Sequence, residues 1–147
     1  MSKELDRTDR RIVEILESHG RTSLADIGKE VGLTGPAVGE RLRGLQERGF
    51  IAGFGARLDL RQFGYMIQAL VRIKPRSGQL HTVENMIREE PRFIACDRVT
   101  GDDCYVARQL LKDVAELDDN LLPFHARAET NTSNEKSFVF ENSMPPL

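Results

Sequence analysis

The sequence predicts an α+β protein with an N-terminal (winged) helix-turn-helix domain followed by a ferredoxin-like βαββαβ domain. Three observations predict it. Apolar residues recur at helical spacing through the first fifty residues, they alternate with polar residues from about residue 66, and strand-like and helical stretches then follow in the order β-α-β-β-α-β. We therefore expect a helix-turn-helix domain over 1–50, an extended segment and linker over 51–65, a ferredoxin-like domain over 66–141 and a tail over 142–147.

The first two expected helices each begin at a residue that can cap them. Asp6 is a candidate N-cap for a helix over about 6–18, and Gly20 lies just past its end. Ser23 begins the second helix, and Asp26 three residues later makes a weak capping box. The inward residues are Ile12, Val13, Ile15 and Leu16 in the first helix, and Leu24, Ile27 and Val31 in the second.

A tight turn at Gly32-Leu33 separates the second helix from a third. Thr34 can cap the third helix, Pro36 is tolerated in its first turn, and Gly49 ends it. Two short helices joined in this way are typical of a helix-turn-helix, in which the second helix enters the major groove of DNA. Its inward residues are Val38, Leu42 and Leu45.

The outward face of the third helix, with the two caps, is the candidate DNA-binding surface. Small residues at its start permit close approach to base edges, and arginine can contact phosphate or guanine. For Arg41, which precedes the inward Leu42, we expect a phosphate contact. The alternative is a structural three-helix bundle with a solvated charged face. The candidate residues are Ser23, Thr34, Gly35, Pro36, Ala37, Gly39, Glu40, Arg41 and Arg43.

The second half alternates between strands and helices. We expect strands at 66–74, 93–100 and 104–111, a two-residue turn at Gly101-Asp102, and a last strand within 127–140. One helix carries Leu80, Val83, Met86 and Ile87 and stops before Pro91; another is opened by Asp113 with Glu116. Because two helices would cover only one face of this sheet, we expect the other face to pack on a second copy of the chain.

Overall charge does not decide the function. The net charge is −2; residues 1–64 hold 11 Lys and Arg against 10 Asp and Glu, and residues 65–147 hold 10 against 13. No apolar run approaches the roughly 20 residues that a membrane span needs, and no signal peptide is evident, so we expect a cytoplasmic protein with no membrane partner.

The sequence also argues against catalysis and metal binding. No nucleophile motif or phosphate-binding glycine loop occurs, and His19, His81 and His125 are scattered, so we expect no enzyme, no metal and no cofactor. A two-residue turn would place Cys96 opposite Ala107, so we expect free thiols.

The chain resembles the Lrp/AsnC family of feast/famine transcriptional regulators. The resemblance is carried by LDRTDRRI at 5–12, GRTS at 20–23, GLT at 32–34, Val38, Arg41-Leu42, Leu45, GFI at 49–51, VTGDDCY at 99–105 and TNTS at 130–133. It implies dimers that often associate into octamers or other assemblies, double-stranded DNA as partner, and pairing of the segment after the third helix with that of the partner subunit. The sequence departs from the family pattern at Asn134-Glu135-Lys136, where apolar β-branched residues are usual, and Gln109 interrupts the third strand.

The resemblance also implies an amino-acid or related effector near the turn at 101–103. Backbone N–H groups at a glycine turn suit a carboxylate, and an aspartate suits an ammonium group. The alternatives are an ordinary acidic turn, an effector-independent DNA-architectural protein, or a small-molecule-binding module or enzyme with a merely structural N-terminal bundle. The candidate effector residues are Gly101, Asp102, Asp103 and Cys104, with Thr130, Asn131 and Thr132 from a neighbouring chain.

Overall fold

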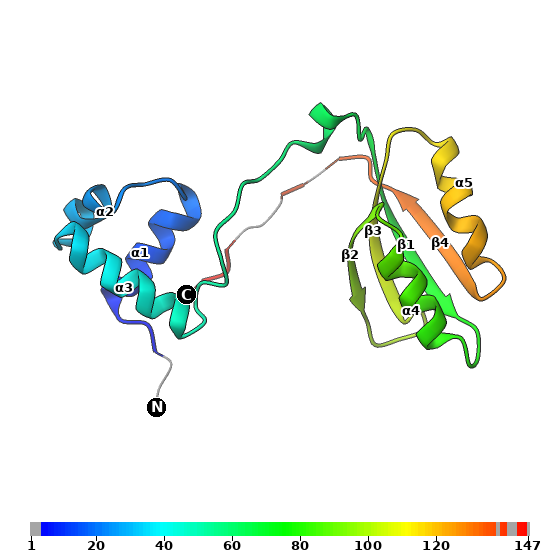
Figure 1. The fold of residues 1–147 in the computed structure, drawn as a ribbon, viewed down its shortest axis with the longest axis horizontal. Coiled ribbons are helices and arrows are strands. Elements are labelled where there is room, and N and C mark those ends of the chain that lie inside the picture. Colours follow the sequence, from blue (N-terminus) through cyan, green and yellow to red (C-terminus); the bar gives the residue numbers. More distant parts are fainter. Residues whose placement is uncertain (1–3, 138, 141–143, 147) are drawn as a thin grey trace. The chain divides into compact units, whose positions relative to one another are not determined.

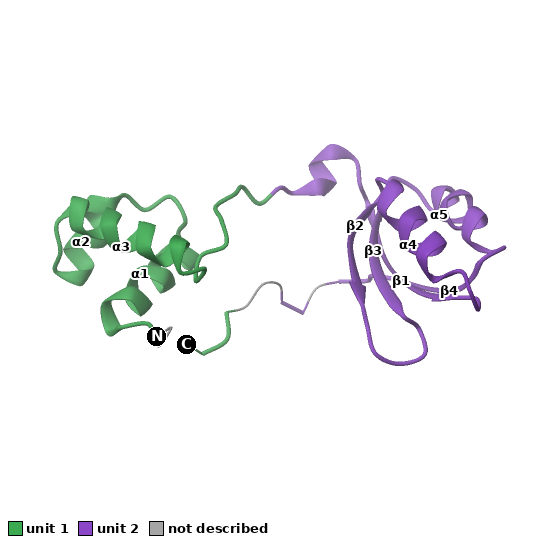
Figure 2. Cartoon of the chain, turned by 60° about the horizontal axis from the view of Figure 1, so that its bottom comes forward, with its two compact units in different colours: residues 1–57, 142–147 green, residues 58–141 purple. Residues whose placement is uncertain are grey.

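The computed structural model describes residues 4–137, 139–140 and 144–146. It divides into two compact units, residues 1–57 with 142–147 and residues 58–141 (Figures 1 and 2). The first unit is helical and the second is an α/β sandwich, so the predicted fold class is confirmed. No helix among the described residues is both long and apolar enough to cross a membrane.

Three capped helices form the first unit: α1 (Arg7–Ser18), α2 (Leu24–Val31) and α3 (Gly35–Glu47). Each predicted N-cap side chain accepts a hydrogen bond from the backbone three residues on: Asp6 at 2.7 Å, Ser23 at 3.1 Å and Thr34 at 3.4 Å. These bonds satisfy amide groups that have no partner within the helix, which is why the helices begin at these residues. The buried core consists of Ile12, Ile15, Ile27, Val38 and Leu45.

The turn between α2 and α3 depends on close backbone approach. Gly32 ends α2 at φ 72°, a conformation that glycine adopts without strain. Inside α2, a Cβ on Gly28 would lie 2.3 Å from the carbonyl oxygen of Leu33. Any side chain at position 28 would therefore push against the turn between the two helices. Leu24, expected on the buried side, remains 39% exposed at the edge of this contact.

The segment after α3 is extended and largely exposed. Residues 51–59 form no strand with another described part of the chain, and the short helix η1 (Leu60–Phe63) follows. Four large apolar side chains between 54 and 66 are each more than half exposed: Phe54, Leu58, Phe63 and Met66. Pairing of this segment with a partner subunit stays a prediction.

The second unit is a four-stranded antiparallel sheet in the order β2-β3-β1-β4. The strands are β1 (Ile67–Pro75), β2 (Phe93–Arg98), β3 (Tyr105–Leu111) and β4 (Ala128–Asn134). Helices α4 (Leu80–Glu89) and α5 (Ala115–Leu121), with η2 (Leu122–Phe124), cover one sheet face (Figure 1). The core between helices and sheet includes Val71, Ile73, Val83, Ile87, Tyr105, Ala107, Leu121 and Phe124.

The β2–β3 connection corrects the predicted two-residue turn. Six residues, 99–104, separate the strands, and β2 ends at Arg98 rather than at Thr100. Cys104 adopts φ 60°, and the Tyr105 N–H donates to the Asp103 carbonyl at 2.7 Å. The turn is therefore wider, because Asp103 does not pair with β2. The register is nevertheless as predicted, since Cys96 lies opposite Ala107.

The last strand keeps its register despite its polar end. β4 pairs with β1 from Pro75 opposite Ala128 to Ala69 opposite Asn134. Beyond it, the Glu135 N–H donates to the Gln68 carbonyl at 2.8 Å, and the Gln68 side chain donates to the Glu135 carboxylate. One backbone and one side-chain hydrogen bond therefore continue the pairing of the two strands beyond Asn134.

The second helix of this unit begins close to Asp113 and Glu116, as predicted. Asp113 accepts from the Glu116 N–H at 3.2 Å, and Glu116 accepts from the Lys112 N–H at 3.1 Å. The bond to Asp113 satisfies an amide in the first turn of α5, which begins at Ala115.

Candidate nucleic-acid interface and effector loop

The exposed side of α3 is a line of residues at spacings of four, three and four. Pro36, Glu40, Arg43 and Glu47 are exposed, whereas Val38 and Leu45 on the opposite side are buried. We call these four residues the exposed line of α3. Sequence reasoning missed Glu47, although its spacing from Glu40 and Arg43 is helical. The remaining candidates on α3 (Gly35, Ala37, Gly39, Arg41) flank this line and are partly buried.

Arg43 is held between two glutamates of the same helix. Its Nη2 lies 2.5 Å from Glu40 Oε2, and its Nε lies 3.7 Å from Glu47 Oε1. The Arg43 and Glu40 side chains are 65% and 68% exposed. Because water screens such pairs, they add little stability and can rearrange on binding.

Arg41 instead points to α1. Its Nη1 donates to Asp6 at 2.6 Å and to Asp9 at 2.9 Å. The buried Asp9 carboxylate also accepts from Arg48 at 2.7 Å. The hydrogen bond from Arg41 is the largest cause that lowers the pKa of Asp6 below its ordinary value. Arg41 therefore fixes α3 against α1, a role that the sequence did not indicate.

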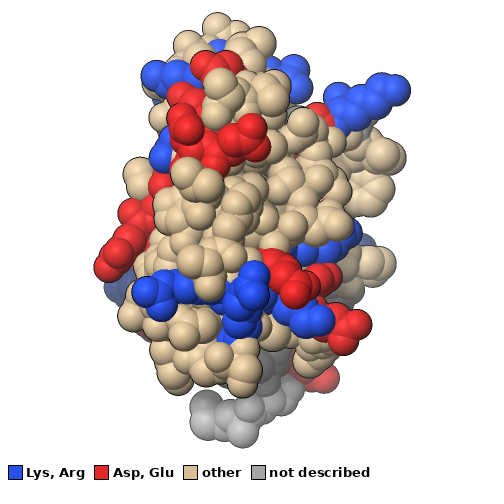
Figure 3. All heavy atoms as spheres, turned by 90° about the vertical axis from the view of Figure 1, so that its right-hand side faces the viewer, with Lys and Arg blue, Asp and Glu red and all other residues tan. Residues whose placement is uncertain are grey.

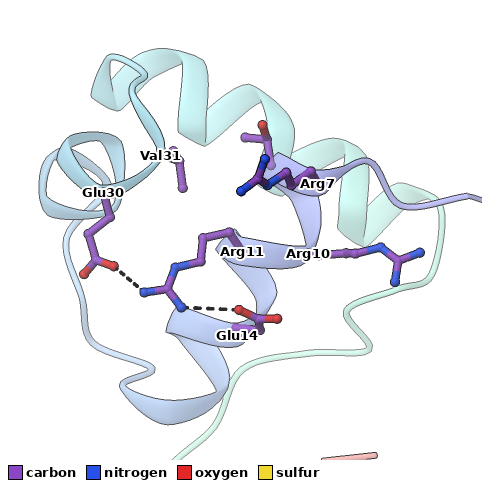
Figure 4. Close-up of a pocket in the computed structure, with 7 residues that line it drawn as sticks. Arg7, Arg10, Arg11, Glu14, Glu30 and Val31 are labelled. Atoms are coloured by element: carbon purple, nitrogen blue, oxygen red, sulfur yellow. Dashed lines mark hydrogen bonds and ion pairs between the residues drawn. The ribbon is translucent and has the colours of Figure 1, made fainter. Parts of the chain in front are cut away.

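The α1 surface carries a second group of arginines. Arg7, Arg10 and Arg11 line a shallow pocket of about 470 Å³ together with residues of α2 (Figure 4). Arg11 donates to Glu30 at 2.8 Å and lies 3.3 Å from Glu14. Carboxylates thus already pair with one of these three guanidinium groups.

The effector candidates come from one end of the sheet but not from one face. Residues 101–103 lie in the β2–β3 loop, where Gly101 has φ 119°. In β4, Thr130 and Thr132 stand opposite Ile73 and Val71 and so share the helix-covered face. Asn131 stands opposite Arg72 and belongs to the open face. A single chain therefore does not bring all seven candidates together.

Arg72 of β1 connects two parts of the candidate site on the open face. Its Nε lies 3.8 Å from Asp103 Oδ2, and it is the cross-strand neighbour of Asn131. The side chains of Arg72 and Asp103 are 47% and 44% exposed. Sequence alternation placed Arg72 on the polar face of β1, but only the strand order shows that it lies between the loop and β4.

A charged pocket of about 450 Å³ lies beside the same loop on the helix-covered side, lined by residues that include Glu84 and Cys96. Glu84 accepts from Arg88 at 2.8 Å, from the Tyr105 hydroxyl at 2.8 Å and from Arg98. These hydrogen bonds, that of Arg88 first, lower the pKa of Glu84 to about 2. Burial is the main cause that raises the pKa of the Cys96 thiol.

Charge on the surface is local rather than uniform. On the face drawn in Figure 3, groups of acidic and of basic side chains lie next to one another. The net charge of −2 adds no general positive field, so DNA binding depends on particular residues.

A capped helix-turn-helix joined to a separate βαββαβ domain defines a class of protein: DNA-binding transcriptional regulators with a second, sensing or assembly domain. Residues 5–46 match the AsnC-type helix-turn-helix domain, and residues 68–141 match the Lrp/AsnC ligand binding domain. The chain therefore belongs to the Lrp/AsnC family of transcriptional regulators.

Named relatives agree with this assignment. The chain is 31% identical over 121 residues to the HTH-type transcriptional regulator FL11 of Pyrococcus horikoshii, covering 82% of this chain and 80% of the relative. It is 34% identical over 115 residues to the Bkd operon transcriptional regulator of Pseudomonas aeruginosa, covering 76% and 75%.

Solved structures share the fold along nearly the whole chain. LrpC of Bacillus subtilis has a TM-score of 0.86 at 24% identity, covering 95% of this chain and 99% of that one. The feast or famine regulatory protein of Mycobacterium tuberculosis, solved with L-methionine, has a TM-score of 0.87 at 25% identity, covering 97% and 99%.

Proposed function

We propose that this regulator binds operator DNA through the exposed line of α3 and the N-termini of α2 and α3, and that an amino acid bound at the 101–104 loop controls that binding. The observation that carries the proposal is the pairing of an outward-facing α3 with a second domain of the ligand-binding type. The helix N-termini at Ser23 and Thr34 present amide groups that suit phosphate.

The effector in this proposal is a small amino-carboxylic compound. In support, the M. tuberculosis relative was solved in complex with L-methionine. The Gly101 turn offers backbone amides to a carboxylate, and Asp102 and Asp103 offer carboxylates to an ammonium group. Arg72 extends the set as a further partner for a carboxylate. Residues Thr130, Asn131 and Thr132 of an adjoining subunit complete the site.

The proposal includes self-association. The sheet face opposite α4 and α5 is not covered by a described helix, and the 51–66 segment exposes Phe54, Leu58 and Met66. A dimer, or an assembly of dimers, would bury this apolar surface and present two α3 helices to half-sites one or more turns apart, roughly 10 bp per turn. Sedimentation at micromolar concentration should therefore give a mass well above 16.6 kDa. If sedimentation shows only a species of 16.6 kDa, the proposed self-association is wrong.

One experiment tests DNA binding and sensing together. Genomic fragments retained by the protein give an operator, and its affinity is then measured with and without each of a panel of amino acids. We expect the effector to change affinity by roughly 5- to 150-fold, the usual range of coupling between sites. Asp103→Ala should abolish this response and leave effector-free binding unchanged, because the loop lies in the other unit.

The matched control is Asp97→Ala, which removes an exposed carboxylate from the neighbouring strand β2. It should respond as the wild type does. An equal response from Asp103→Ala would remove that residue from the site. No response of the wild type to any amino acid would favour an effector-independent architectural protein.

A further inference from the structure

The Glu40–Arg43 ion pair lies in the middle of the exposed line of α3. We propose that this pair recognises one G·C base pair in the major groove, with Arg43 on guanine and Glu40 on cytosine. The inference rests on the proposed function, because it takes α3 to be the helix that enters the groove. It goes further by assigning the two side chains to particular base atoms.

Charge on the exposed line argues against a general phosphate contact. Glu40, Arg43 and Glu47 sum to −1, so the attraction of the single arginine for phosphate is offset by two carboxylates. A carboxylate next to DNA is repelled by phosphates unless a base donates a hydrogen bond to it. In the major groove, such a donor is the N4 amino group of cytosine, which glutamate and aspartate accept from.

The geometry of the pair fits the edge of a G·C base pair. Guanine presents two neighbouring acceptors, N7 and O6, and the next group across the base pair is the cytosine N4 donor. Adenine offers only one acceptor beside its donor, so it does not match a guanidinium equally well. Arg43 and Glu40 already place a donor and an acceptor side by side, 2.5 Å apart at Nη2 and Oε2.

Both side chains keep groups free for the bases. Within the described part of the chain, Nη1 of Arg43 and Oε1 of Glu40 take part in no hydrogen bond or ion pair. Small residues flank the pair: Ala37 precedes it, and Gly44, where a Cβ would meet nothing within 4 Å, follows. They allow the helix backbone to approach the base edges closely, as direct recognition requires.

The test is selection of binding sites from random double-stranded DNA, followed by affinity measurements on the selected site with one base pair changed. The wild type should fix one G·C pair per half-site and prefer it by roughly 5- to 150-fold. Arg43→Ala should lose that preference while other positions stay fixed. Glu40→Gln should weaken the preference for cytosine over thymine at the same position, because an amide can donate to thymine O4 as well as accept from cytosine N4.

The matched control is the Arg11–Glu14 pair of α1, which has the same spacing of three residues and comparable exposure. Arg11→Ala and Glu14→Gln should leave the selected site unchanged. The inference is overturned if the G·C position survives in both α3 variants, or if Arg43→Ala weakens all sequences equally and lowers the salt slope. If the wild type selects no sequence at all, the proposed function itself is wrong.

Discussion

Arg41 on α3 donates a hydrogen bond to the buried carboxylate of Asp9 on α1 at 2.9 Å. This contact joins residues 32 positions apart and gives the α3 arginine a structural partner within its own domain. Arg48 holds the second oxygen of the same carboxylate at 2.7 Å. The orientation of α3, and with it any DNA contact, therefore depends on an acid in the first turn of α1.

We predict that Asp9→Ala destabilises the first unit. Removing one partner from a buried pair costs about 3–5 kcal/mol; because both arginines are partly exposed, we expect roughly 1–3 kcal/mol. Urea unfolding followed by circular dichroism at 222 nm measures this loss. Asp26→Ala, which removes an exposed acid in the first turn of α2, is the control and should cost less. Equal losses would mean that burial of Asp9 does not matter.

Arg41→Ala separates a structural role from a phosphate contact. If Arg41 also contacts phosphate, its loss should reduce the slope of log affinity against log salt by about one. If Arg41 acts only through Asp9, any loss of affinity for the operator should accompany a loss of stability of the first unit. The slope of log affinity against log salt should then equal that of the wild type. Operator titrations at several salt concentrations distinguish the two results, and Arg43→Ala supplies the comparison for an exposed arginine.

Gly28 and Gly44 are both helical glycines with opposite surroundings. A Cβ at Gly28 would lie 2.3 Å from a backbone oxygen, whereas a Cβ at Gly44 would meet nothing within 4 Å. We expect Gly28→Ala to lower the free energy of unfolding by about 1–3 kcal/mol through overpacking. Gly44→Ala should raise it by about 1 kcal/mol through helix propensity. Thermal unfolding at 222 nm checks both; stabilisation by Gly28→Ala would contradict the close approach of α2 to the turn.

Gln109 is a fully buried amide of β3 whose nitrogen and oxygen have no hydrogen-bond partner among the described residues. An unpaired buried polar group costs about 1–3 kcal/mol. Gln109→Met, similar in shape and apolar, should therefore raise the free energy of unfolding of the second unit by that amount. Tyrosine fluorescence reports on this unit, because Tyr65 and Tyr105 both lie in it. Gln46→Met on the surface of α3 should give no such gain.

Glu84 should make the second unit sensitive to acid. Its folded-state pKa of about 2 lies below the ordinary value of 4.5, so its stabilising effect is complete above pH 4.5 and is lost as the pH falls through 2. Glu84→Gln should be less stable than the wild type at pH 7, with the difference shrinking between pH 4.5 and 2. Urea midpoints across this range measure it. A difference that does not change with pH would show that packing, not charge, is the cause.

The sequence alone determined the elements whose boundaries depend on local contacts. Asp6, Ser23 and Thr34 bond to amides only three residues away, so the N-caps were predictable from residue type and spacing. The hydrogen bond from the Glu116 N–H to Asp113 has the same range. The alternation of β1 and the register that sets Cys96 opposite Ala107 also follow from neighbouring residues.

Tertiary structure alone decided which of these residues meet. Asp9 lies 39 positions from Arg48 in the chain, and Arg72 reaches Asp103 only because β1 pairs with β3, the strand that follows the 99–104 loop. Alternation along β4 separates Asn131 from Thr130 and Thr132, but only the pairing with β1 shows that Asn131 lies on the open face. Helical and strand periodicity state which face of an element is apolar, but not which distant element packs there. The element that packs on each apolar face depends on how the whole chain folds around its two cores, and the pattern of neighbouring residues does not specify this.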